Sequence, residues 1–185
     1  MTTRPATAAD VPAIGEIDSV IESTSYLHVE QSVAEGTVGW RLERRPLREK
    51  LIEPHALDDD TRFALRQVAG GGDEGLCIVA EHDGEVVASL LAQPREADTL
   101  LLLDLRVDCA RRREGLATVM LFQMIEHATN AGHRAASVVT LTNNDPAYQM
   151  LTKLGWHLSG IDTRRNTNHD LVKERASLVW YYEIT

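Results

Sequence analysis

The second half of this chain alternates strand and helix patterns, and this alternation constrains the fold more than any other feature of the sequence. Residues 99–107 and 135–141 are apolar runs of strand length, and the stretch between them at 116–131 carries a helical pattern. A second helical pattern follows, and two further extended segments lie at 156–162 and 176–184. Strands that alternate with helices predict an α/β fold with a mixed sheet.

The helical pattern at 116–131 is the clearest in the chain. Its apolar residues recur every three or four positions and predict one buried stripe, and Gly132 ends the pattern. The members of this stripe are Ala117, Met120, Met124, Ala128 and Ala131. The leucine-rich segment 99–107 lacks clean alternation, which predicts a strand buried on both faces.

In the first half, the sequence His-Asp-Gly-Glu at 82–85 predicts a hairpin turn between strands at 76–81 and 86–93. The segment 23–35 fits no single pattern. Before the hairpin we also expect strands at 4–7 and 37–45, and helices after Asp10 and at 62–69.

Length and composition limit the class of protein. The 185 residues predict a single domain spanning 1–185, and the formal net charge of -9 disfavours nucleic acid as a partner. No apolar run is long enough to cross a membrane. Cys77 and Cys109 form no metal-binding motif, so we expect no metal and two reduced thiols in a cytoplasmic protein.

The turn before the best helix is the strongest candidate for a binding site. Residues 111–115 read Arg-Arg-Arg-Glu-Gly and lie between a strand and a helix N-terminus, where unpaired backbone N–H groups bind anions. Gly115 lets the backbone approach a phosphate closely. The sequence contains neither a Walker motif nor a Rossmann glycine pattern, which excludes those two phosphate loops. An exposed basic turn with a structural glycine is the alternative interpretation.

Two ordered motifs resemble the GNAT superfamily of acetyltransferases. The first is Arg112-x-x-Gly115-x-Ala117 at the start of a helix, and the second is Asn144-x-x-Ala147 on a helix that ends at Gly-Trp, 155–156. The tail at 174–181 is similar to streptothricin acetyltransferases, and the segment 40–50 is similar to them more weakly.

This resemblance implies the GNAT fold, with a mixed, mostly antiparallel sheet of six to seven strands, flanking helices and splayed central strands. It implies acetyl-CoA as co-substrate, with pantetheine bound along the backbone at 105–107, the diphosphate bound by N–H groups at 113–118, and Asn144 near the pantetheine. The expected cofactor-binding residues are Leu105, Arg106, Val107, Arg112, Arg113, Glu114, Gly115, Leu116, Ala117, Thr118 and Asn144.

The implied reaction is direct attack of an amine on the thioester, which needs positioning, an oxyanion donor near 105–107 and removal of a proton. We expect Asp104 to act as the base, and Glu81 is a weaker candidate; each could instead have a structural role. Many family members place a tyrosine acid seven residues after the asparagine, where this chain has Leu151. Tyr148, one helical turn earlier, is the substitute candidate, with simple packing as the alternative.

The acceptor is expected to be a primary amine of a small molecule or a peptide. Tyr26 and His28 lie in the segment that forms part of the acceptor site in the family. A protein N-acetyltransferase and a non-catalytic acyl-CoA-binding module are the alternatives, and Leu151 is the feature that supports the latter. Family members are often homodimers, although the sequence shows no interface.

Overall fold

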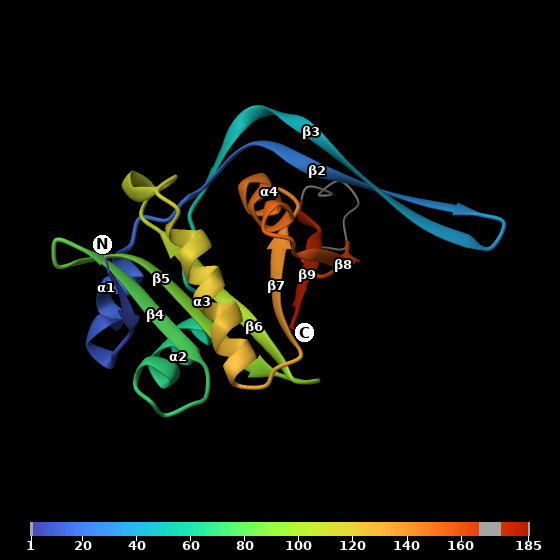
Figure 1. Ribbon diagram of the computed structural model, residues 1–185. Coiled ribbons are helices and arrows are strands. Elements are labelled where there is room, and N and C mark those ends of the chain that lie inside the picture. The colour runs from blue at the N-terminus through green and yellow to red at the C-terminus, as the bar shows by residue number, and fades with distance from the viewer. Residues whose placement is uncertain (1, 167–174, 185) are drawn as a thin grey trace. The chain divides into compact units, whose positions relative to one another are not determined.

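The computed structural model describes residues 2–166 and 175–184 (Figure 1). The helices are α1 (Val11–Glu16), α2 (Asp59–Ala69), α3 (Leu116–Asn130) and α4 (Asp145–Lys153). The strands are β1 (Thr2–Pro5), β2 (Ile21–Ala34), β3 (Thr37–Glu53), β4 (Leu76–His82), β5 (Glu85–Arg95), β6 (Thr99–Val107), β7 (Ala135–Leu141), β8 (His157–Asp162) and β9 (Ser177–Glu183). No helix in the described part of the chain is long and apolar enough to span a membrane.

Seven strands form one mixed sheet in the order β1-β4-β5-β6-β7-β9-β8. The pairs β1–β4, β4–β5, β5–β6 and β8–β9 are antiparallel, whereas β6 and β7 are parallel. The α/β class and the mostly antiparallel mixed sheet are therefore confirmed. The strands β2 and β3 form a second sheet, which the sequence did not predict.

Contacts within the chain divide it into two compact units. Unit 1 comprises Met1–Val20, Pro54–Val138 and Tyr182–Thr185, and unit 2 comprises Ile21–Glu53 and Val139–Tyr181. The strand β7 contributes its first part to unit 1 and its last residues to unit 2.

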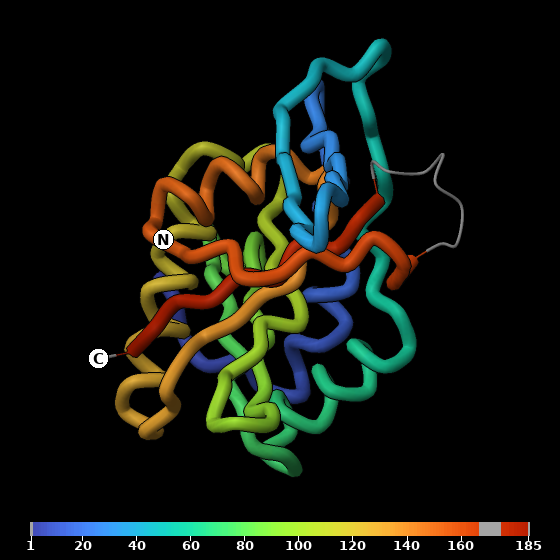
Figure 2. The backbone as a smooth tube through the Cα atoms, turned by 90° about the vertical axis from the view of Figure 1, so that its right-hand side faces the viewer, coloured from blue at the N-terminus to red at the C-terminus, as the bar shows by residue number. Residues whose placement is uncertain are grey.

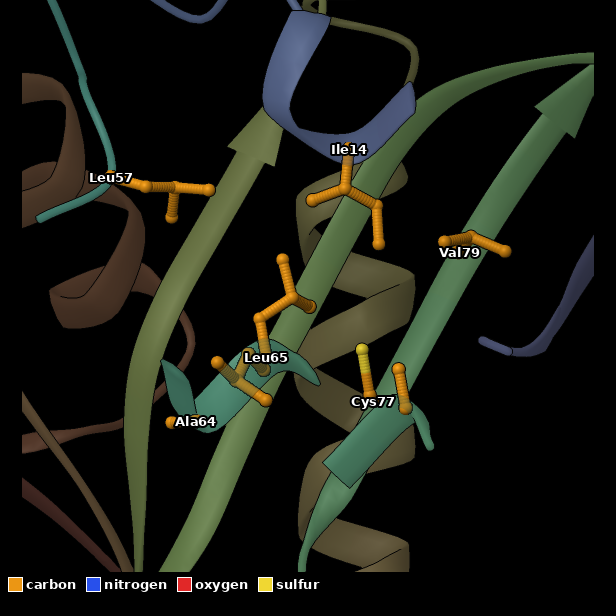
Figure 3. Packing of buried hydrophobic residues seen from close by; sticks show 8 residues of the cluster. Ile14, Leu57, Ala64, Leu65, Cys77 and Val79 are labelled. Atoms are coloured by element: carbon orange, nitrogen blue, oxygen red, sulfur yellow. The ribbon is translucent and has the colours of Figure 1, made fainter. Parts of the chain in front are cut away.

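In unit 1, helices cover both faces of the strands β4, β5 and β6. Figure 3 shows α1 and α2 on one face and α3 behind the strands on the other. Ile14 and Leu65 pack there with Cys77 and Val79 in a buried cluster. Burial in this apolar cluster raises the pKa of the Cys77 thiol to about 12, so this cysteine has the structural role expected for it.

The helix α3 is amphipathic as expected, but its buried stripe is shifted. Met120, Met124 and Ala128 are buried, whereas Ala131 is exposed and Ala117 is only partly covered. The leucines at 116 and 121 are buried in their place. Burial of the two leucines removes more apolar area from water than burial of Ala117 and Ala131 would. The buried stripe of α3 is therefore centred closer to the leucines than the sequence predicted.

A β-bulge interrupts the pairing of β5 with β6. Leu91 pairs with Asp104 and Ala92 pairs with Leu102, so Leu103 is an extra residue on β6. Directly opposed residues point to the same face of a sheet. Asp104 therefore shares a face with Leu91, which belongs to the cluster under α1 and α2. The bulge also explains why the leucine-rich sequence lacks clean alternation.

Unit 2 contains a long hairpin in which β2 and β3 lie side by side (Figure 1, Figure 2). The segment 23–35 is thus largely strand, and the strand expected at 37–45 continues to Glu53. The register shifts between Ser23 and Ser25, where several residues of β3 oppose one residue of β2. Leu27 and Val29 are buried on one face, and the backbone N–H of Leu27 donates to the Thr142 carbonyl.

Candidate active site

The turn that joins β6 to α3 has the backbone geometry of an anion site. Arg113 and Gly115 have φ values of 68° and 86°, on either side of Glu114. A turn in which the hand of the backbone changes between neighbours directs successive N–H groups to one side. Arg113, Glu114 and Gly115 are exposed, and a Cβ atom on Gly115 would meet no atom within 4 Å. Space is therefore present beside Gly115.

The N-terminus of α3 completes this arrangement. Gly115 is the N-cap, no side chain caps the helix, and the first turn contains no acidic residue. The first-turn N–H groups of Leu116, Ala117 and Thr118 are therefore not engaged by a side-chain cap, and the positive end of the helix dipole is not neutralised from within the helix. This end of α3 suits a phosphate group.

The arginines of the turn have different roles. Arg112 donates a side-chain hydrogen bond to the Val20 carbonyl, which fixes the turn to the end of the α1 region within unit 1. Arg111 lies 3.9 Å from the Glu114 carboxylate. The exposed Arg113 side chain adds positive charge next to the amides.

The backbone edge of β6 that faces β7 is paired only up to the bulge in the described pairing. The parallel pairing with β7 joins residues 99–102 to residues 135–138 and ends there. The other edge of β6 stays paired with β5 as far as Val107. The backbone at 103–107 therefore lies beyond the described pairing with β7, and an extended group could add to this edge like a strand.

The expected base, Asp104, is a buried partner in an ion pair. Its Oδ2 accepts from Arg106 Nε at 2.7 Å and its Oδ1 accepts from Arg106 Nη2 at 3.0 Å. The Arg106 side chain is only 2% exposed. Arg106 is expected to bind the cofactor through its backbone, and its side chain pairs with Asp104. A guanidinium buried this deeply requires such a partner.

The sequence did not indicate His55, which lies beside this pair. Its Nε2 is 3.3 Å from Asp104 Oδ1, and about a third of its side chain is exposed. Burial is the main influence on this ring and lowers the pKa of His55, Asp104 raises it, and Arg106 and Arg112 lower it further. His55 is 49 positions from Asp104 in the sequence and belongs to no motif, so only the fold could have identified it.

Asn144 and Tyr148 lie in unit 2. Asn144 is the N-cap of α4, and its side chain accepts a hydrogen bond from the Ala147 N–H. The Tyr148 ring packs edge-on against Trp180, with ring centroids 5.4 Å apart. Leu151, at the position of the family tyrosine, is buried. This packing is consistent with the structural alternative for Tyr148.

The other candidate side chains have contacts of their own. In unit 2, Tyr26 contacts His28 edge-on at 6.3 Å between ring centroids. Glu81, the weaker base candidate, accepts from Arg4 in unit 1, which makes it part of an ion-pair network. Within residues 2–166 and 175–184, no three acidic, histidine or cysteine side chains gather closely enough to hold a metal ion.

Comparison with known proteins agrees with this geometry. Nourseothricin acetyltransferase superposes with a TM-score of 0.77 at 20% identity, over 100% of this chain and 98% of that one. A putative streptothricin acetyltransferase from Bacillus anthracis str. Ames, solved in complex with acetyl coenzyme A, gives 0.77 at 15% identity over 99% of both chains. The ribosomal-protein-S18-alanine N-acetyltransferase from Escherichia coli gives 0.67 at 16% identity, over 100% and 94%.

At 15–20% identity, these structural matches establish the fold alone. The comparison with curated protein sequences found no match. The sequence profile of the acetyltransferase (GNAT) family matches residues 40–156, which include the turn at Gly115 and the cap at Asn144. With more than half of its residues covered by that profile, the chain belongs to the GNAT family of acetyltransferases.

Proposed function

We propose that this acetyltransferase transfers the acetyl group of acetyl-CoA to a primary amine of a small molecule or a peptide. The observation that carries the proposal is the turn at 112–115, where two residues with positive φ precede a helix N-terminus that has no side-chain cap. A diphosphate is the anion that fits several convergent N–H groups and an exposed arginine. The solved relative that contains acetyl coenzyme A supports the same choice.

The remaining contacts follow from the position of this turn at the end of β6. The N–H groups at 113–118 bind the diphosphate, and the β6 edge at 105–107 hydrogen-bonds the pantetheine arm. A backbone N–H of this edge polarises the thioester carbonyl. Asp104 belongs to the group that removes the amine proton, and the family resemblance suggests Asn144 for contact with the pantetheine and Tyr148 for protonating the thiolate.

Little further chemistry is required of the protein. An amine in its neutral form attacks the thioester carbon directly, and holding both reactants in line supplies about 7–11 kcal/mol of the barrier reduction. The similarity to nourseothricin and streptothricin acetyltransferases suggests streptothricin-type amines as one class of acceptor to test. The net charge of -9 favours cationic acceptors generally.

A matched pair of substitutions tests the diphosphate site. Asp and Asn both tolerate a positive φ and both cap helices well, so Gly115→Asp and Gly115→Asn preserve the fold equally. They differ in one negative charge at the amides. We expect isothermal titration with acetyl-CoA to show a loss of at least about 100-fold in affinity for Gly115→Asp, and a much smaller loss for Gly115→Asn. Equal affinities for both variants would contradict the assigned site.

A second candidate function is a non-catalytic acyl-CoA-binding module, because Tyr148 packs against Trp180 and Leu151 replaces the family acid. Release of free CoA distinguishes the two. We expect release when the wild-type protein is mixed with acetyl-CoA and a panel of diamines, lysine-like amines, streptothricin and short peptides. Binding of acetyl-CoA without release across the panel would favour the module, and release with peptides alone would identify a peptide acetyltransferase.

A further inference from the structure

We propose that His55 accepts the proton that the attacking amine loses as the C–N bond forms, and that Asp104 is the residue that positions its ring. This inference rests on the proposed acetyl transfer and deepens it. It replaces a carboxylate base by a histidine that no motif in the sequence marks.

The geometry of the three side chains carries the inference. Asp104 and Arg106 project from β6 on the face that lies under α1 and α2, immediately before and within the stretch proposed to bind pantetheine. His55 approaches Asp104 from the segment between β3 and α2, two residues before the buried Leu57. Burial of Leu57 in the cluster anchors the short segment that carries the histidine.

The carboxylate is poorly suited to take the proton itself. Arg106 engages both of its oxygens, at 2.7 and 3.0 Å, and the Asp104 side chain is only 5% exposed. Protonation of Asp104 would leave the buried guanidinium without its counter-charge, which is costly. The same carboxylate orients His55, because Nε2 faces it at 3.3 Å and Nδ1 is left as the proton acceptor of the ring.

Burial is the main influence that keeps the His55 ring neutral, and the charges around the ring modify its pKa further. The groups that influence it are the Asp104 carboxylate and the Arg106 guanidinium on β6, and the Arg112 guanidinium on the turn after β6. Burial and the two arginines outweigh the carboxylate, so the pKa of His55 is below its ordinary value. The ring is therefore unprotonated at neutral pH, as a base must be, and the partly exposed side chain is accessible to an acceptor.

The proton balance of the step is simple. The lone pair of the amine forms the C–N bond to the thioester carbon, and the nitrogen becomes a cation and thus a much stronger acid. Its proton passes to His55 Nδ1, the C–S bond breaks, and the electron pair of that bond leaves on sulfur. The thiolate then gains a proton from solvent, directly or by way of Tyr148, while the imidazolium returns one to solvent, which regenerates neutral His55.

The test compares His55→Gln with His82→Gln. His82 is a matched control because its Nε2 also lies 3.3 Å from an aspartate, Asp83, and its side chain is 31% exposed against 32% for His55. We expect kcat to fall by about 100-fold or more in His55→Gln. The affinity for acetyl-CoA by titration should change by less than about twofold, and His82→Gln should match the wild type in both.

Two further readouts separate a proton acceptor from a structural residue. The acidic limb of the wild-type kcat/KM profile, which reports protonation of His55, should disappear in His55→Gln. Added imidazole should restore turnover to His55→Ala and should not change His82→Ala.

A His55→Gln enzyme with wild-type kcat and an unchanged acidic limb would overturn the inference while the proposed function stands. A wild-type protein that binds no acetyl-CoA, or that releases no CoA with any amine, would overturn both. A His55→Gln protein that has lost its acetyl-CoA affinity would also overturn the inference, because it would show a structural role for the ring.

Discussion

At the scale of single residues, several donors meet each buried carboxylate in the part of the chain that the structure describes. The Asp10 carboxylate accepts from two Arg4 nitrogens at 2.8 Å, from the Thr7 backbone N–H at 2.7 Å and from the Thr7 hydroxyl at 2.9 Å. These bonds, with that from Arg4 the largest influence, hold the pKa of Asp10 well below its ordinary value. The network ties β1 to the start of α1 within unit 1.

Asp10→Asn should therefore destabilise the folded protein by about 1–3 kcal/mol at pH 7, as the charge-assisted bonds are lost. A carboxyl whose folded pKa is lowered stabilises the protein above its unfolded pKa of about 3.9 and loses this contribution as the pH falls further. The difference between variant and wild type should thus shrink below about pH 4. Urea denaturation of both proteins from pH 3 to pH 7 measures this difference in the free energy of unfolding.

Asp83→Asn is the control, because its side chain is 89% exposed. We expect its effect on the free energy of unfolding to stay within about 0.5 kcal/mol at every pH. A pH-independent loss in Asp10→Asn would show that the carboxylate charge is not what stabilises this network.

Local chemistry also decides which site residues the sequence could indicate. Gly115 was indicated because a glycine before a helix start suits a phosphate, and Asn144 because it matches a family motif; the structure places both as N-caps. Asp104 was found because an acid among leucines is conspicuous. Its partners Arg106 and His55 were not assigned to it, since such a pairing depends on the bulge and on a distant loop.

At the scale of elements, the sequence predicted the helices and strands of residues 76–162 to within two or three residues. It failed at the hairpin of β2 and β3, whose exposed outer part lacks the half-buried alternation that marks a strand. The base of this hairpin is held by Asp145, which is buried and accepts from Ser25 Oγ at 2.6 Å, Arg44 Nη2 at 2.7 Å and Gln149 Nε2 at 2.6 Å.

Asp145→Asn should loosen the base of the hairpin. Burial raises the pKa of this carboxyl, but the bonds from Arg44, Ser25 and Gln149 together bring it below its ordinary value, so its charge is used in the folded state. We expect a loss of about 1–3 kcal/mol. Hydrogen exchange should be faster at the Leu27 amide, which donates to the Thr142 carbonyl next to α4.

Glu43→Gln on the same hairpin is the comparison, because it removes the exposed pair of Glu43 with Arg45. Such pairs contribute at most about 1 kcal/mol, and we expect no change at Leu27. Equal exchange rates in both variants would mean that Asp145 does not hold the hairpin.

At the scale of the whole molecule, the proposed function requires an acidic protein to bind an anionic co-substrate. The net charge of -9 opposes the approach of acetyl-CoA at long range, and the arginines at 111–113 reverse that effect locally. Ligand binding to the folded state alone also stabilises the whole chain. At 100 times the dissociation constant the gain is about 2.7 kcal/mol.

For a protein of this size, that gain predicts a rise in Tm of about 5–10 °C with saturating acetyl-CoA. Differential scanning fluorimetry of the wild type and of Gly115→Asp measures it. We expect the shift to fall to about 1–2 °C or less in the variant at the same concentration. A shift of the same size in both proteins would mean that acetyl-CoA is held elsewhere.

The bulge at Leu103 has a consequence for how this strand tolerates change. Beyond it, the side of the sheet that each residue occupies is set by the residue of β5 that it opposes and not by its own identity. A substitution at Leu103 alters local packing and leaves the pairing of β6 with β5 unchanged. Deletion of Leu103 would place Asp104 directly after Leu102 and still opposite Leu91, so that Asp104 and Arg106 would stay on the same face and remain paired with each other. Beyond the bulge, the faces of β6 therefore tolerate both a substitution and the loss of the extra residue.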